Sequence, residues 1–269
     1  MSEKKFRDYS KINEQIKNNY KKNRINQTSD YVLRMKKEFV KRKKVKMHLW
    51  EIVDKLSKFI DISDPDINLP NSFHLFQAAE KARLDNKPDW FQLVCLLHDI
   101  GKIMYLWGKD KNGMTIKEQW GIVGDTFITG CVIPPKIIFP EFNKFNREND
   151  FYLEKKQYNG KYENNCGLNN CLVSWGHDEF LFMVLKNNKN TIPQEGLYII
   201  RYHSLYLWHD KNEYKMFENE IDTKMKPCVQ QFNKYDLYTK NNNKFNINEL
   251  KEYYLKIFFK YFNSEYLVV

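Results

Sequence analysis

The sequence predicts a single all-α domain, and three observations carry this prediction. Several stretches repeat their apolar residues at the i, i+3, i+4 spacing of a buried helix face. Stretches with the alternating pattern of a strand are few, and no internal repeat is visible. The chain has 269 residues, of which 42% are apolar and 16% aromatic. It can therefore bury one sizeable core, which excludes wholesale disorder.

The first elements follow from where apolar residues appear in a polar background. Residues 1–30 are polar with isolated aromatic anchors, and we expect an N-terminal arm that packs on a helical catalytic domain formed by residues 31–269. Helical patterns run over residues 31–40 and 47–60. Residues 61–66 are acidic and contain a proline, so they should break the helix.

The next two helices begin after prolines. Asn71 or Ser72 is expected to cap a helix over residues 73–82, and Asp89 to cap the helix that leads into residues 93–102. Residues 108–119 read as a polar loop, and residues 134–165 as a segment that wraps the surface.

The C-terminal half continues the helical pattern. Ser174 is the expected cap of a helix that runs to residue 185, and Pro193 lies in the first turn of another. Residues 225–238 predict a buried helix. An Asn- and Lys-rich loop over residues 239–249 should precede an aromatic C-terminal helix.

Composition limits the functions that remain. The net charge is +10, but the basic residues are scattered among Asn-rich segments, with one cluster at residues 41–44. No zinc-finger or RNA-binding signature accompanies the charge, so we expect no nucleic-acid partner. The five cysteines make no CxxC pair, and no stretch of about 18 apolar residues is present. We therefore expect a cytoplasmic protein with reduced cysteines and no membrane partner.

The stretch over residues 93–102 sets polar groups into an apolar wall. His98 and Asp99 interrupt its run of leucines, and Lys102 follows one turn later. Burying an ionised group without a partner costs several kcal/mol. A metal ion bound by His98 and Asp99 would compensate for the cost of burying them. A histidine bonded to a backbone carbonyl is the alternative, because His-Asp also occurs at residues 177–178 and 209–210.

Six such residues lie inside otherwise apolar helical stretches. They are His74, His98, Asp99, His177, His203 and Asp236. A set of nitrogen and oxygen ligands without thiolate suits one or two catalytic ions of iron, manganese or zinc. His48 follows the basic cluster and should lie on the surface. His209 lies six residues after His203, so on a continuous helix it would face elsewhere.

Eight sequence blocks, in order along nearly the whole chain, carry a family resemblance. They are SDPD at residues 63–66, PNSFH at 70–74, LLHDIGK at 96–102, QWGIVGDTF at 119–127, CGL at 166–168, SWGHDE at 174–179, IRYHS at 200–204 and FNKYDLYTK at 232–240. Together they resemble the inositol oxygenase (myo-inositol oxygenase) family of the HD-domain superfamily.

The resemblance implies an HD-domain-like helical bundle around a mixed-valent centre of two iron ions. One iron would be held by His74, His98, Asp99 and Asp236, and the second by His177 and His203, with Asp99 bridging. The implied substrate contacts are Arg7, Asp61, Ile62, Ser63, Lys102, Gly124, Asp125, His203 and Ser204. Ile62 departs from the acidic residue that the family pattern leads us to expect there.

The implied reaction cleaves the ring of myo-inositol with O₂ to give D-glucuronate and water, in a monomeric enzyme. Inositol hydroxyls are too weakly acidic to ionise at neutral pH, and a bound metal lowers such a pKa. Asp99 and Lys102 are the implied catalytic residues, with Lys102 steadying the substrate oxygens by charge and hydrogen bonding.

Two other functions remain open at this point. A metal-dependent phosphohydrolase of the HD superfamily would use His74, His98, Asp99 and Asp236 equally well, with a metal-activated water as nucleophile. It would not need the polyol contacts expected of Lys102, Asp125 and Ser204. A basic binding module without enzymatic activity would leave the histidines in apolar helices unexplained.

Overall fold

Helices dominate the computed structural model, which describes residues 8–9, 12–66, 69–238 and 246–269. In this part of the chain strands form a single two-stranded sheet. The elements in chain order are α1 (Glu14–Asn26), α2 (Ser29–Lys41), β1 (Lys46–His48), α3 (Leu49–Leu56), α4 (Asn71–Leu84), α5 (Asp89–Leu97), the 3₁₀ helices η2 (Ile100–Trp107), η3 (Asp110–Asn112) and η4 (Pro140–Phe145), α6 (Arg147–Glu154), η5 (Leu168–Asn170), α7 (His177–Asn187), α8 (Gln194–Tyr202), α9 (Tyr206–His209), η6 (Lys215–Phe217), α10 (Glu220–Tyr238), α11 (Ile247–Phe262) and β2 (Tyr266–Val268). The predicted all-α class is confirmed.

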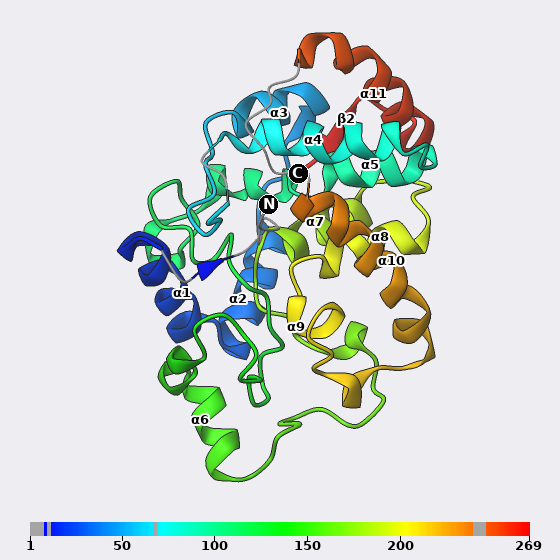
Figure 1. Ribbon diagram of the computed structural model, residues 1–269. Coiled ribbons are helices and arrows are strands. Elements are labelled where there is room, and N and C mark those ends of the chain that lie inside the picture. The colour runs from blue at the N-terminus through cyan, green and yellow to red at the C-terminus, as the bar shows by residue number, and fades with distance from the viewer. Residues whose placement is uncertain (1–7, 10–11, 67–68, 239–245) are drawn as a thin grey trace, which may run out of the picture.

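Helices α4 and α5 form the centre of the bundle. They pack side by side, and α11 lies along the outer side of α5 (Figure 1). Ala78, Ala79 and Ala82 of α4 are fully buried, and their small side chains let the neighbouring helix approach closely. Residues 91–97 of α5 are all buried, which explains why its sequence is apolar on every side.

Helix α10 packs against α4 and α5, α8 packs against α5, and α7 extends the core by packing against α8. The 3₁₀ helix η2 packs against α7, and this contact depends on a glycine. A Cβ atom at Gly101 would lie 2.1 Å from the carbonyl oxygen of His177, so a larger residue would push the two elements apart. Because η2 follows His98 and Asp99 directly, Gly101 fixes how closely these two residues approach His177.

The sheet was not predicted. β1 and β2 pair antiparallel, with Met47 opposite Leu267, and both side chains are buried. The helix expected over residues 47–60 is therefore shorter, from Leu49 to Leu56. Strands of three residues carry too little alternation to be distinguished from a helix by pattern.

The predicted helix caps are wrong in three places. Pro70 and Pro88 occupy the N-cap positions of α4 and α5, and neither helix has a side-chain cap. Each proline has an extended ψ, 138° at Pro70 and 153° at Pro88, and it has no N–H to donate, so it fits the N-cap and the next residue is the first helical one. Gly176 is the N-cap of α7.

Ser174, which was expected to cap α7, makes a different hydrogen bond. The Ser174 hydroxyl accepts a hydrogen bond from the Phe127 N–H at 3.1 Å. It thus ties the segment before α7 to residues 126–128 rather than closing the helix end.

The first helix belongs to the segment predicted as an N-terminal arm. α1 packs against η4, with Ile16, Tyr20 and Arg24 among its buried residues. Residues 1–7 and 10–11 of this arm, and residues 239–245 of the predicted Asn- and Lys-rich loop, lie outside the described residues. Among the described helices, none combines the length and apolar character that crossing a membrane requires.

Candidate metal centre

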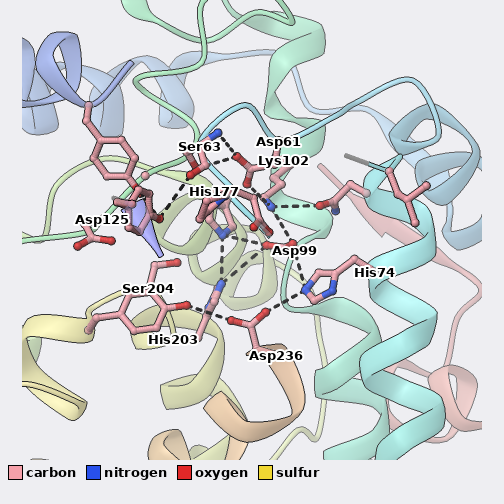
Figure 2. A pocket seen from close by; sticks show the side chains of 18 residues that line it. Asp61, Ser63, His74, Asp99, Lys102, Asp125, His177, His203, Ser204 and Asp236 are labelled. Atoms are coloured by element: carbon pink, nitrogen blue, oxygen red, sulfur yellow. Dashed lines mark hydrogen bonds and ion pairs between the residues drawn. The ribbon is translucent and has the colours of Figure 1, made fainter. Parts of the chain in front are cut away.

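The six predicted ligands converge on one buried point, as Figure 2 shows. His74 lies on α4, His98 and Asp99 at the junction of α5 and η2, His177 at the start of α7, His203 at the end of α8 and Asp236 on α10. None of the six is more than 6% exposed. Five segments that are distant in sequence therefore meet at this centre.

Asp99 lies between two sets of histidines. Its Oδ2 is 3.5 Å from Nε2 of His98 and 4.0 Å from Nε2 of His74. Its Oδ1 is 3.1 Å from Nε2 of His177 and 3.9 Å from Nε2 of His203. Each set has donor atoms close enough to share one ion, and Asp99 belongs to both. One carboxylate with an oxygen toward each set has the arrangement of a bridging ligand.

Asp236 joins the first set. Its Oδ1 lies 2.9 Å from Nε2 of His74 and 3.6 Å from Nε2 of His98. The hydroxyl of Tyr206 donates to the other oxygen, Oδ2, at 3.2 Å. This hydrogen bond holds the carboxylate with Oδ1 turned toward the histidines.

Backbone carbonyls orient three of the four imidazoles. In each, Nδ1 lies within hydrogen-bonding distance of a main-chain oxygen and donates to it, which leaves the lone pair on Nε2. The acceptors are Cys95 for His98 at 2.8 Å, Ile122 for His177 at 2.7 Å and Ile200 for His203 at 3.0 Å. All three Nε2 atoms then face the shared carboxylate of Asp99 as electron-pair donors.

Two observations show that this donor set fits a metal cation. His98 Nε2 is buried and has no hydrogen-bond partner in the described structure. The Nε2 atoms of His177 and His203 lie 3.1 Å apart. With both Nδ1 atoms protonated, their lone pairs face each other and repel unless a cation or a proton lies near them. Imidazole and carboxylate ligands without thiolate suit iron.

A buried lysine compensates part of the negative charge. The Lys102 ammonium donates to Asp61 Oδ2 and Asp99 Oδ2, both at 2.8 Å, and to Asn71 Oδ1 at 3.1 Å. Burial alone would lower the pKa of Lys102, but the two carboxylates raise it above its ordinary value. Burial likewise opposes ionisation of Asp99, yet Lys102 and the nearby histidines hold its pKa well below the usual range. The lysine is therefore charged, and all three of its protons are shared with protein oxygens.

A polar pocket opens beside the centre and contains most of the predicted substrate contacts. Those that line it are Asp61, Ser63, Lys102, Gly124, Asp125, His203 and Ser204, together with His74, Asp99, His177 and Asp236. Ile62 does not line the pocket, and its backbone N–H donates to Gln119 instead. Arg7 lies outside the described residues.

Other lining residues were missed by the sequence reasoning. They include Tyr9, Tyr20, Asp64, Asn71 and Tyr206. Tyr9 and Tyr20 had a signal, because each is an aromatic residue isolated in a polar segment, but that pattern also fits simple anchoring. Asn71 was interpreted only as a helix cap, although it lies three residues before His74.

A helical bundle that gathers four histidines and two aspartates beside a polar pocket has the donor set and the substrate space of a metal-dependent enzyme. The model of one protein family, described as myo-inositol oxygenase, matches residues 13–268. The chain belongs to the myo-inositol oxygenase family. The resemblance drawn from the sequence blocks, and the class of enzyme that it implied, are confirmed.

Relatives from distant organisms agree with this family assignment. The chain is 40% identical to inositol oxygenase 1 of Arabidopsis thaliana over 264 residues, which cover 97% of this chain and 83% of that protein. It is 41% identical to inositol oxygenase of Rattus norvegicus over 264 residues, 95% of this chain and 88% of the relative. It is also 41% identical to inositol oxygenase of Dictyostelium discoideum over 267 residues, 97% of this chain and 88% of the relative.

Proposed function

We propose that this enzyme cleaves the ring of myo-inositol with O₂ to give D-glucuronate and water, and that it uses two iron ions per chain. The observation that carries the proposal is the carboxylate of Asp99, which presents one oxygen to each of two histidine sets. The names of the relatives supply the substrate, inositol, and the type of reaction.

The ligands divide between the ions in the way the distances suggest. One iron would be held by His74, His98, Asp99 and Asp236, and the other by Asp99, His177 and His203. When bound, a mixed-valent iron pair supplies the electron transfers of O₂ chemistry and lowers the pKa of a substrate hydroxyl. The protein's own task is to orient the substrate and to keep the charges of the site balanced.

Two loops on one side of the pocket are joined and should orient the substrate together. The N–H of Thr126 donates to the carbonyl of Ser204 at 3.2 Å, which links the Gly124–Asp125 turn to the end of α8. Gly124 has a φ of 115°, a conformation that side chains rarely adopt. We assign the Asp125 carboxylate and the Ser204 hydroxyl to the substrate's hydroxyl groups, as acceptor and as donor or acceptor respectively.

Asp61, Ser63 and Lys102 form the opposite wall. Ser63 donates from both its hydroxyl and its backbone N–H to Asp61 Oδ1, at 2.7 and 2.8 Å. The other oxygen of Asp61 holds Lys102. Lys102 thus keeps Asp61 and Asp99 in place and presents a positive charge to the substrate oxygens.

Polar groups outside the ligand set distinguish this function from phosphoester hydrolysis. Iron ions would neutralise Asp99 and Asp236, and Asp61 is paired with Lys102 at 2.8 Å. Asp64, Asp125 and the Ser204 hydroxyl also line the pocket. A neutral polyol can donate hydrogen bonds to the carboxylates of Asp64 and Asp125, whereas a phosphate group would meet them with like charge. These residues support a neutral substrate rich in hydroxyl groups over an anionic phosphoester.

Oxygen uptake by the iron-loaded enzyme tests the proposal. Addition of myo-inositol should start O₂ consumption with one D-glucuronate formed per O₂, and metal analysis should find two irons per chain. A phosphate ester given to the same preparation should remain intact. Hydrolysis of the ester without O₂ uptake on myo-inositol would establish the phosphohydrolase instead. We also propose that the enzyme is a monomer in the cytoplasm. Size-exclusion chromatography tests the monomer, and cell fractionation tests the location.

A further inference from the structure

Two cysteines that the proposed reaction does not use lie in contact beside η5. The Sγ atoms of Cys166 and Cys171 are 3.8 Å apart, on either side of the 3₁₀ helix η5. Both are free thiols. Cys166 is half-buried, and Cys171 is buried. The two thiols therefore differ in burial, and Cys166 is the less buried one.

The backbone of the turn brings the two thiols together. Gly167 has a φ of 84°, and a Cβ atom there would lie 2.3 Å from Asn219 Nδ2, so a glycine is required. The Gly167 N–H donates to the carbonyl of Phe217 at 2.7 Å, and the Cys171 N–H donates to that of Leu168 at 3.0 Å. These bonds fold residues 166–171 back on themselves and hold the cysteines close.

Side-chain bonds anchor the turn to the core. The N–H of Leu168 donates to Asp222 Oδ2 at 3.0 Å. Asn169 Oδ1 accepts from Arg201 Nη1 at 2.7 Å and from the Tyr202 hydroxyl at 3.0 Å. A turn fixed at this many points keeps the thiols close together, which gives their reaction a high effective concentration.

We propose that Cys166 and Cys171 are a modification site, at which a peroxide converts the two thiols into one intramolecular disulfide. The sulfur atoms must close from 3.8 Å to about 2.0 Å, the length of a disulfide bond. Rotation of the two side chains provides such a movement while the backbone bonds of the turn remain.

The reaction balances in two steps. The Cys166 sulfur attacks one oxygen of hydrogen peroxide, the O–O bond breaks, and the products are a sulfenic acid at Cys166 and one water. The Cys171 sulfur then attacks the Cys166 sulfur, the S–O bond breaks, and a second water leaves with the thiol proton. The two thiols lose two electrons and the peroxide gains them.

The order of the steps follows from burial. Cys166 is the less buried of the two and is assigned the first reaction with the peroxide. Burial, together with the neighbouring Cys166, raises the pKa of Cys171, so Cys171 stays a protonated thiol and acts second. Cys228 is also half-buried, but the described residues place no second thiol beside it. It is the natural control.

Thiol mapping of the iron-loaded full chain tests the proposal. Hydrogen peroxide followed by alkylation and peptide mass spectrometry should show two fewer alkylated thiols, a cross-linked pair of residues 166 and 171, and recovery with dithiothreitol. The C228S variant should behave like the wild type. In C171S, a sulfenic-acid probe should label Cys166, and in C166S the cross-link and the labelling of Cys171 should both be absent.

Three results would overturn it. Both cysteines could remain fully alkylated after peroxide, the oxidation could spread evenly over all five cysteines, or Cys166 could be oxidised irreversibly without a cross-link. Even oxidation would show unselective damage by iron and peroxide rather than a site. Because C166S and C171S keep the size of the side chain, loss of the cross-link in them is not an effect of unfolding if their thermal midpoints match that of the wild type.

Discussion

At the scale of single residues, the centre depends on carboxylates that stay ionised although they are buried. Lys102 supports Asp99 and Asp61, and a histidine and a tyrosine contact Asp236. Burying an ionised carboxylate is costly unless it is paired. Removing the group that pairs with it should therefore lower stability as well as activity. Three substitutions separate metal binding, substrate binding and folding.

Replacing Asp236 by alanine should remove a charged ligand from the first histidine set. We expect iron content to fall by about one ion per chain and turnover to fall by more than about 100-fold, because a ligand rather than a supporting group is lost. Metal analysis and O₂ uptake measure both. Asp210→Ala, at an exposed carboxylate paired with Lys211, is the control and should match the wild type. Full iron occupancy in Asp236→Ala would remove this residue from the ligand set.

Replacing Lys102 by methionine should leave the iron in place but weaken the reaction. The substitution keeps the length of the side chain and removes the charge that faces Asp61 and Asp99. We expect kcat/KM for myo-inositol to fall by about 10- to 100-fold and the unfolding free energy to fall by about 3 kcal/mol, since two carboxylates lose their buried partner. Unchanged kinetics at full iron content would exclude Lys102 from the site.

His209 separates support of the fold from metal binding. It is not in either candidate ligand set, as expected, but the continuous helix on which that expectation rested is interrupted between Tyr202 and Tyr206. However, it is buried, and its Nε2 donates to the carbonyl of His203 at 2.8 Å. His209→Ala should therefore keep its iron and lose about 1–3 kcal/mol of stability in urea unfolding. A loss of iron without a loss of stability would contradict this assignment.

At the scale of elements, a buried ion pair joins the two helices that carry the second histidine set. Glu179 of α7 accepts from Arg201 of α8 at 2.6 and 3.2 Å and pairs with Lys36 of α2 at 2.6 Å. Glu179 lies two residues after His177, and Arg201 two residues before His203. The same ion pair thus fixes the relative positions of both histidines.

Arg201→Met should test this connection. It leaves Glu179 with the partly exposed Lys36 as its remaining cation among the described residues, so we expect a loss of about 3–5 kcal/mol in unfolding free energy. Lys36→Met is the matched control and should cost less, because its ammonium is closer to solvent. Urea unfolding compares them. An equal cost for the two substitutions would show that Arg201 has no special role.

The sequence predicted the elements better than their ends. Apolar spacing indicated α4, α5, α7 and α8, because each of them buries a wide apolar face. The ends were set by tertiary contacts that no local pattern contains. The helix through His98 stops at Leu97 and continues as η2, since Gly101 must pack against the carbonyl of His177.

At the scale of the whole molecule, the small sheet joins distant parts of the chain. β2 brings residues 266–268 onto β1, and the N–H of Val269 donates to the carbonyl of Val45 at 2.9 Å. Leu267 is fully buried between these segments, whereas Val268 is 38% exposed. The two neighbouring positions therefore allow a direct comparison of buried and exposed side chains.

Leu267→Ala should destabilise the protein by about 2–5 kcal/mol, because it leaves a cavity between the two strands and the core that they cover. Val268→Ala should cost less than about 0.5 kcal/mol, since that side chain faces solvent. Thermal or urea unfolding measures both. Equal effects would mean that the sheet contributes little to the fold.

The ligands were more predictable from sequence than the pocket around them. His74, His98, His177 and Asp236 stand out because a polar residue in an apolar helix demands a reason. Asn71 and Tyr206 line the same pocket from the first residues of two helices and Asp64 from a loop, positions where polar and aromatic residues are common. Only the folded arrangement shows that they face the centre.

The carbonyls that hold three of the imidazoles have a consequence for how the gene can vary. Had Cys95, Ile122 and Ile200 contacted the rings through their side chains, a single base change could remove an orienting group. Every amino acid has a main-chain carbonyl oxygen, so no substitution at these positions removes the acceptor. These three positions are therefore free to drift in amino-acid identity, within what the packing tolerates, without altering which nitrogen of each ring carries the proton.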